Sequence, residues 1–180
     1  MPSAVLGDGT DFKYVDAPFF VPHFFFDCSI GGPSSSAEIL VRSLIDHGSD
    51  TVLIDPVYIN HLGLAHHKLP KPKKVMMVVG QGKKEVFLFD EWVPLTVISA
   101  NQVWTSHTCR AILAPNLCVP LLLGNPFLAT NGIVIDHKLR TCLDKKSSYD
   151  LINPPAIKCT MIKLHPTFGP ELRKQVNRNW

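Results

Sequence analysis

The sequence has little that would indicate a metal site, a disulfide framework or a thiol enzyme. Its five cysteines are odd in number and widely spaced, and none forms a C-x-x-C pair, which disfavours both a disulfide framework and a zinc site. The closest histidine and cysteine, His107 and Cys109, have no third ligand at a recognisable spacing, so a zinc enzyme or a cysteine protease is also disfavoured. We therefore expect reduced cysteines, mostly in the core, and no metal ion or cofactor.

A signal peptide and a long apolar segment are also lacking. Residues 1–13 contain no basic region followed by an apolar run, as a secretory signal would. The most apolar stretch, Phe19–Phe26, is interrupted by Pro22 and His23 and falls far short of the ~20 apolar residues that span a bilayer. These absences predict an intracellular, cytoplasmic protein that does not bind a membrane.

A strong excess of charge of one sign is lacking as well. The chain has 18 lysines and arginines and 15 aspartates and glutamates, which leave a net charge of +3 that is spread along the sequence. Nucleic-acid-binding domains normally carry a concentrated basic face, so we expect no nucleic acid partner. The densest basic run, His66–Lys74, is predicted to be a solvated loop.

The residues that are present are typical of an all-β domain. Of the 180 residues 46% are hydrophobic and 18% are charged, and 15 prolines accompany 11 glycines. This length suits one domain with its own core, and the many turn formers favour short strands. We expect a flexible N-terminal tail at 1–18, one domain at 19–145, and a C-terminal extension at 146–180 in which 168–177 could form a helix.

Turn signals divide the domain into strands and two short helices. Phe19–Cys28 and Ala37–Ile45 are rich in aromatic and β-branched residues, and the glycine- and serine-rich turn between them predicts a hairpin. Asp55 before Pro56 predicts the start of a short helix that Gly63 ends. A second short helix is predicted at Phe127–Asn131, and further strands at Thr51–Ile54, Val75–Val79, Glu85–Phe89, Trp92–Ser99, Val103–Leu113, Val119–Leu123, Ile133–Asp136 and Leu139–Leu143.

One carboxylate stands at the end of an apolar strand. Asp46 follows that strand and precedes His47, Gly48 and Ser49, after which Thr51–Ile54 forms another apolar run. A strand, a tight turn and a second strand in this order hold a single carboxylate rigidly at the rim of a core.

A second motif farther along the chain strengthens the first. Pro120–Leu128 (PLLLGNPFL) and Asn131–Asp136 (NGIVID) combine an apolar strand, a glycine, a short helix and another strand. With the Asp46 segment, this motif resembles the retropepsin-like aspartic proteases of gypsy-type LTR retrotransposons, including those of fungal retroelements. In that family an Asp-Ser/Thr-Gly loop lies in the same strand-loop-strand frame, buttressed by the second motif. The resemblance covers residues 19–145.

The resemblance implies a closed-barrel, all-β retropepsin fold with one or two short helices, and the activity of an aspartic endopeptidase. Peptide hydrolysis by this route needs one ionised and one protonated carboxyl group that share a proton. A chain with one such motif must then form a homodimer, in which Asp46 of each subunit contributes to the dyad. The implied substrate is a peptide or a retroelement polyprotein, and we expect an acidic pH optimum.

The resemblance also suggests where the substrate binds. The hairpin from Val75 to Phe89 falls where the family has a flap, so its glycine-rich tip is expected to cover the substrate. Asp50 occupies a position where the family often holds the substrate main chain, or is alternatively a solvated turn residue. Asn125 stands where retroviral relatives carry an arginine that pairs with that carboxylate. The residues expected to contact the substrate are Asp50, Val79, Gly80, Gln81, Gly82, Leu122 and Leu123.

His47 departs from the family pattern, which has serine or threonine after the catalytic aspartate. In the family that hydroxyl forms a hydrogen bond across the dimer axis. A neutral imidazole could accept one such bond, but two protonated rings facing each other at low pH would repel. Three interpretations stay open: an active protease with an altered contact, a protease whose dimer forms only in a precursor, and an inactive retropepsin-like module that dimerises or binds peptides.

Overall fold

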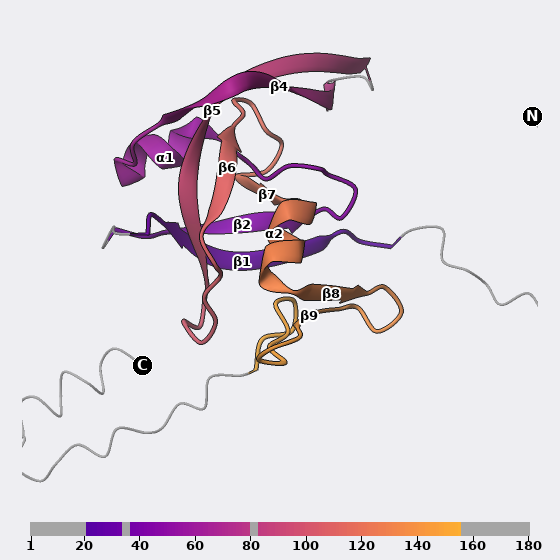
Figure 1. Cartoon of the computed structure of the whole chain (residues 1–180). Helices are drawn as coiled ribbons and strands as arrows, with labels where there is room; N and C mark the ends of the chain where they lie inside the picture. Colours follow the sequence, from indigo (N-terminus) through magenta and orange to yellow (C-terminus); the bar gives the residue numbers. More distant parts are fainter. Residues whose placement is uncertain (1–20, 34–36, 80–82, 156–180) are drawn as a thin grey trace, which may run out of the picture.

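The computed structural model describes residues 21–33, 37–79 and 83–155, which are mostly β with two short helices (Figure 1). The predicted N-terminal tail, the hairpin tip Gly80–Gly82 and the predicted helix within 168–177 lie outside the described residues. In chain order the elements are β1 (Phe24–Gly31), β2 (Ile39–Ile45), β3 (Leu53–Ile54), α1 (Pro56–Leu62), β4 (His67–Val79), β5 (Lys83–Ser99), β6 (Cys109–Leu113), β7 (Leu121–Leu123), α2 (Asn125–Asn131), β8 (Ile133–Asp136) and β9 (Thr141–Asp144).

The predicted first hairpin is formed by β1 and β2. The two strands pair antiparallel, with Phe26 opposite Ser43. Alternate side chains of β1 face the core, so that Phe26, Cys28 and Ile30 are buried while Asp27 is exposed. The buried Ser43 hydroxyl donates a hydrogen bond to the Phe26 carbonyl at 2.8 Å. Its polarity is therefore satisfied inside the core.

Seven strands form one sheet, in the order β1-β2-β7-β3-β6-β5-β4. β1, at one end of this order, also pairs antiparallel with β5. The pairs β2–β7 and β3–β6 are parallel, and β8 and β9 form a separate two-stranded sheet. The pairings of β1 with both β2 and β5 mean that the sheet curls back on itself.

Two hydrophobic clusters fill the molecule. The larger one draws buried side chains from β1, β2, β3, β5, β6 and β7 and from both helices. The smaller one consists of Leu53, Phe89, Ile112 and Ala114, and lies where the β4–β5 hairpin meets β3 and β6. In Figure 1 this long hairpin crosses the top of the molecule, above β7 and α2.

Both predicted helices are present. Asp55 caps α1, since its Oδ1 accepts a hydrogen bond from the Val57 amide at 3.0 Å, and Pro56 occupies the first turn. Gly63 ends α1 and Gly132 ends α2, each in the left-handed conformation that favours glycine. Neither helix of the described part is long and apolar enough to cross a membrane.

Gly124 is the point where β7 and α2 touch the Asp46 loop. A Cβ atom at Gly124 would lie 2.0 Å from the carbonyl oxygen of Thr51 and 2.8 Å from that of Ser49. The next amide, that of Asn125, donates a hydrogen bond to the Ser49 carbonyl at 2.9 Å. Because no side chain fits at this contact, a glycine lets β7 lie between the two strands that flank Asp46.

The β4–β5 hairpin is longer than the sequence predicted. β4 includes most of the basic run His66–Lys74, so the prediction of a solvated loop is wrong. β5 is continuous, so Trp92–Ser99 is its second half and not a separate strand. The backbone of this lysine-rich segment forms its hydrogen bonds with β5, a distant partner that composition does not indicate. A register shift interrupts the pairing between Lys68 and Lys73.

The packed core continues past residue 145, where the sequence predicted the C-terminal boundary of the domain. Tyr149 and Leu151 are only 6% and 2% exposed and belong to the larger core cluster. Asp144, which is also buried, accepts a hydrogen bond from the Trp104 indole at 3.0 Å. The polar sequence after residue 144 concealed this segment, which packs through only a few apolar side chains.

We predict that Gly124→Ala destabilises the protein more than Gly132→Ala. The added methyl group at Gly124 would overlap backbone oxygens, and such overpacking costs roughly 3 kcal/mol. At Gly132 nothing lies within 4 Å of the added Cβ, so only the positive φ opposes the change, at about 1 kcal/mol. Urea unfolding of the two variants measures the difference, and equal losses would contradict the close contact at Gly124.

We also predict that acid removes a stabilising contribution of Asp144. Burial raises the pKa of this carboxyl, but hydrogen bonds from Ser147, the Lys146 amide and Trp104 lower it further than burial raises it, so the pKa lies below the ordinary 3.8. A group whose pKa is depressed on folding stabilises the protein above its ordinary pKa, and this contribution is lost as the pH falls through the folded-state value. Asp144→Asn should lower the free energy of unfolding by roughly 2 kcal/mol at neutral pH, and by progressively less below about pH 4.

The matched control is Asp27→Asn. Asp27 is exposed and lies 3.8 Å from Arg42 in a surface ion pair, so its loss should change the stability little at neutral or acid pH. Urea titrations of the three proteins across this pH range are the measurement. A penalty for Asp144→Asn that did not vary with pH would show that the carboxylate charge is not what stabilises this segment.

Candidate active-site cleft

Asp46 lies at the end of β2, in a tight turn bonded on both sides. Its amide donates to the Leu123 carbonyl of β7 at 3.0 Å, and its carbonyl accepts from the Ser49 amide at 3.2 Å. Its side-chain Oδ1 accepts from the Gly48 amide at 2.9 Å. These bonds fix both the backbone and the half-buried carboxylate of Asp46. The predicted strand, turn and carboxylate are therefore present at this place in the fold.

The rest of the loop is also held by hydrogen bonds. The Ser49 hydroxyl donates to the Thr51 carbonyl at 3.0 Å and accepts from the Thr51 amide at 3.3 Å. A Cβ at Gly48 would lie 3.2 Å from Oδ1 of Asp46, so a larger residue there would press on the carboxylate. The loop is therefore a fixed support for one carboxylate.

A cleft of about 810 Å³ opens beside this loop. Asp46, Gly48, Ser49 and Asp50 form one part of its wall, and Lys74–Met77 of β4 form another. The apolar part continues the smaller core cluster, against which several of the lining side chains pack. The other lining residues are Leu44, Thr51, Leu53, Asn116, Leu117, Cys118 and Leu122.

Only some of the residues expected to contact a substrate line this cleft. Leu122 lines it, as expected, but Leu123 is fully buried in the core. Alternation along β7 turns the Leu122 side chain toward the cleft and the Leu123 side chain toward the core. Val79 is described as the last residue of β4, with its backbone opposite Lys83, while Gly80, Gln81 and Gly82 lie outside the described residues.

Asp50 lines the cleft and forms an ion pair that the sequence did not reveal. Its Oδ2 lies 2.8 Å from Nζ of Lys73 in β4, and the side chains of Asp50 and Lys73 are 76% and 39% exposed. Asn125 stands where retroviral relatives of the resembled family carry an arginine. It contacts the loop through its backbone amide. Lys73 was missed because the run that contains it looked like a solvated loop.

His47 lies apart from the cleft. It lines a second cavity of about 430 Å³, together with Asn125, Leu128 and His137 among others. The His47 and His137 rings meet edge to face, with their centroids 5.1 Å apart. One turn therefore presents Asp46 to the cleft and His47 to this second cavity.

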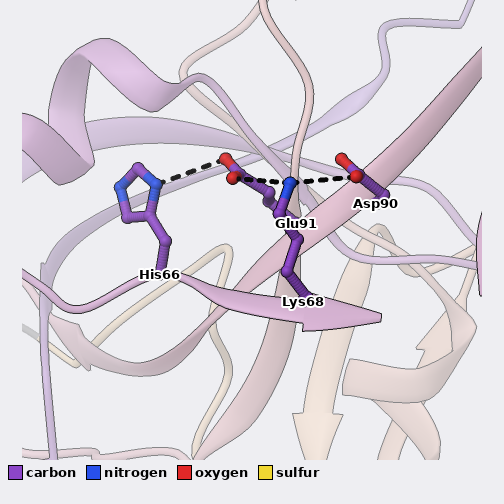
Figure 2. Close-up of polar contacts among 4 residues, drawn as sticks. All are labelled: His66, Lys68, Asp90 and Glu91. Atoms are coloured by element: carbon purple, nitrogen blue, oxygen red, sulfur yellow. Dashed lines mark hydrogen bonds and ion pairs between the residues drawn. The ribbon is translucent and has the colours of Figure 1, made fainter. Parts of the chain in front are cut away.

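A cluster of exposed charged groups fixes the start of the hairpin (Figure 2). Lys68 Nζ lies 2.9 Å from Asp90 and 3.0 Å from Glu91, and the His66 ring lies 3.4 Å from Glu91. The hydrogen bonds with Asp90 and Glu91 raise the pKa of Lys68, and the bond with Lys68 lowers the pKa of Glu91. Exposed pairs of this kind are individually weak, but together they connect β4 and β5 before the register shift.

The cysteines of the described part differ sharply in exposure. Cys28, Cys109 and Cys142 are buried and free, and burial raises the pKa of each thiol to about 12. Cys118 is exposed and lines the cleft. The described residues contain no group of three or more histidines, cysteines and acidic residues that could hold a metal ion.

Comparison with known proteins found a structural likeness but no match in sequence. No family model matches the chain, and no curated protein matches it. The retroviral protease-like domain of Ddi1 from Leishmania major is similar in structure, with 14% sequence identity and a TM-score of 0.46. The match covers 75% of this chain and 93% of that domain. A likeness this distant assigns no role to any residue, so the candidate site stands on the geometry of the chain itself.

We predict that Cys118 is the most reactive of the four described thiols in the native protein. Near pH 8 a thiol with a pKa of about 12 is ionised to only about one part in 10,000, and burial also excludes the reagent. Alkylation followed by peptide mapping should therefore label Cys118 quickly and label Cys28, Cys109 and Cys142 only after unfolding. Peptide mapping reports Cys159 separately. Equal labelling of all four in the native state would contradict the described core.

Proposed function

We propose that this chain is a retropepsin-like aspartic endopeptidase that acts as a homodimer, with Asp46 of each subunit in the catalytic dyad. The observation that supports it most is the setting of the Asp46 carboxylate. The turn holds it through the Gly48 amide, β7 supports the turn from behind, and the carboxylate lines a cleft of about 810 Å³. That volume is typical of pockets that bind ligands.

The strand pairings support a closed barrel as the finer description of the fold. The order β1-β2-β7-β3-β6-β5 returns to β1 through the β1–β5 pairing. β7 lies between β2 and β3, which flank the Asp46 loop. We infer that this arrangement is the barrel in which retropepsins hold their catalytic loop.

We infer that the second carboxyl group comes from another copy of the chain. The other carboxylate that lines the cleft, Asp50, is already paired with Lys73. Two Asp46 carboxyls about a two-fold axis would share one proton because like charges at ~3 Å cannot both be ionised. The dyad then titrates with two apparent pKa values that belong to the pair.

In the proposed reaction the ionised Asp46 takes a proton from water, whose oxygen attacks the carbonyl carbon of the peptide bond. The protonated Asp46 of the other subunit gives its proton to the carbonyl oxygen, which forms a tetrahedral intermediate. The intermediate collapses as the C–N bond breaks: the leaving nitrogen takes the proton that the first Asp46 removed from water, and one hydroxyl of the intermediate returns its proton to the second Asp46. The products are a carboxylic acid and an amine.

The walls of the cleft support an extended peptide as the substrate. Leu44, Leu53, Leu117 and Leu122 give it an apolar part, and the Asp46 loop gives it polar groups. We extend the proposal to a retroelement polyprotein as the natural substrate, on the strength of the sequence resemblance. The buried free cysteines suit a reducing compartment, which supports an intracellular, cytoplasmic site of action.

A second candidate function is a peptide-binding module that does not cleave. The position of His47 favours it. His47 replaces the hydroxyl that the family uses across the dimer axis, and its ring contacts His137 on the side away from the cleft. Such a module would use the same cleft to bind peptides, but would lack a productive dyad.

We predict that the purified chain cleaves peptides between about pH 3.5 and 7, where such a dyad titrates. Asp46→Asn should lower the rate by about 10⁴-fold or more, because one member of the dyad can no longer take or give the proton, and pepstatin should inhibit the wild type. Asp27→Asn, which changes an exposed carboxylate outside the cleft, should leave cleavage unchanged. The measurement is cleavage of a mixed peptide library, with sedimentation to report the dimer.

Two outcomes would contradict the proposal, one by rejecting the activity and one by rejecting the role of Asp46. A dimeric wild type that binds peptides and cleaves none would establish the peptide-binding module. Cleavage that survives in Asp46→Asn would place the catalytic group elsewhere.

A further inference from the structure

Lys73 links the β4–β5 hairpin to the Asp46 loop. Among the described residues it is the only member of β4 whose side chain forms a hydrogen bond or ion pair with that loop, through Nζ and Oδ2 of Asp50 at 2.8 Å. Asp50 lies four positions after Asp46, on the same loop, and both line the cleft. The hairpin and the loop that carries the carboxylate are therefore connected by one charged contact at the cleft.

The position of Lys73 along β4 gives this contact a particular importance. β4 pairs with β5 up to Lys68, where the cluster in Figure 2 fixes the strand. Residues 69–72 have no pairing partner on β5, and regular pairing resumes at Lys73. Two of these four residues, Pro70 and Pro72, have no amide to donate to the ladder. Lys73 is thus the first residue after a break in β4, and its ion pair fixes the strand a second time.

Lys73 also shares a face of β4 with residues that line the cleft. Lys73, Val75 and Met77 are half-buried, and Lys74 and Met76 between them are exposed, as expected for alternation along a strand. Val75 and Met77 pack against the smaller core cluster, and both line the cleft, as the exposed Lys74 and Met76 also do. The ion pair lies close to Val75 and Met77 along β4. It therefore sets the distance of these two side chains from the Asp46 loop.

The exposure of the Lys73–Asp50 ion pair limits its contribution to stability and to binding. Ion pairs between exposed side chains shift equilibria only about 1.4-fold to 5-fold. A contact of that strength contributes little to the stability of the whole domain. It is sufficient to change the affinity of a ligand that binds between β4 and the Asp46 loop.

We propose that Lys73 is a positioning residue for peptide binding, which acts through Asp50. It holds Val75 and Met77 of β4 at a fixed distance from the Asp46 loop, and it neutralises Asp50, so that this end of the cleft does not favour basic side chains. The peptide ligand and the cleavage readout rest on the proposed function, whereas the contact between hairpin and loop does not.

The first test compares Lys73→Met, Asp50→Asn and the double variant with Lys71→Met. Lys71 is an exposed lysine of the same strand and has no ion pair among the described residues, so Lys71→Met is the matched control. In about 20 mM salt, Lys73→Met should raise KM about twofold to fivefold with kcat within a factor of about two. The rise should disappear in the Asp50→Asn background and in about 500 mM salt. A rise that persists in both would mean that only the methylene stem of Lys73 matters, and would overturn the proposal.

A change of specificity gives a readout that a purely structural role would not produce. In Lys73→Met the unpaired Asp50 carboxylate should attract basic side chains, so library peptides that contain lysine or arginine should be cleaved faster relative to neutral ones, by about twofold to fivefold. Asp50→Asn and the double variant should not show this preference. A Lys73→Met enzyme with the wild-type preference would contradict the neutralising role.

Hydrogen exchange separates failure of this proposal from failure of the proposed function. In the unliganded protein, amides of residues 73–79 and 83–89 should exchange about twofold to fivefold faster in Lys73→Met and Asp50→Asn than in the wild type, and not in Lys71→Met. If the wild type cleaves no peptide but these amides respond, the endopeptidase is rejected and the contact between hairpin and loop is supported. If the wild type cleaves peptides, and neither the exchange of these amides nor KM changes in Lys73→Met, the proposed role of Lys73 is rejected. The proposed endopeptidase activity is then retained.

Discussion

The contact between β7 and the Asp46 loop is the constraint on which the candidate site depends. Because Gly124 has no side chain, the backbone of β7 and α2 can lie directly against the carbonyls of Ser49 and Thr51. Hydrogen bonds from the Asp46 amide to Leu123 and from the following helix to Ser49 then close both ends of the turn. A carboxylate supported in this way is positioned before a ligand binds, which is what catalysis by a fixed group requires.

The same turn separates two environments. Asp46, Ser49 and Asp50 line the large cleft, whereas His47 lies with His137 in the second cavity. In a homodimer that brings two Asp46 carboxyls together, the residue after each aspartate lies close to the axis. In the proposed homodimer, the contact of His47 with His137 of its own chain would compete with a contact across that axis.

Acid would act on the proposed enzyme in two opposite ways. An aspartic dyad needs one protonated carboxyl and therefore works best in acid. Asp144 and Asp150 are different, because hydrogen bonds lower the pKa of each carboxyl below its ordinary value although burial raises it. Both anchor the segment after β9, which carries Tyr149 and Leu151 into the core. Protonation of these two carboxylates therefore sets the lower limit of the pH range in which the proposed enzyme stays folded.

Local rules along the chain were enough to predict the β1–β2 hairpin, the cap and stop of α1, and the strand and turn that carry Asp46. Alternation, capping residues and glycine positions act within a few residues, so they can be read along the chain. Only the tertiary structure decided which leucine of β7 faces the cleft, that the basic run belongs to β4, and that Lys73 pairs with Asp50. These features depend on partners far away in the chain, and the free energy of such contacts exists only once the sheet has brought the partners together.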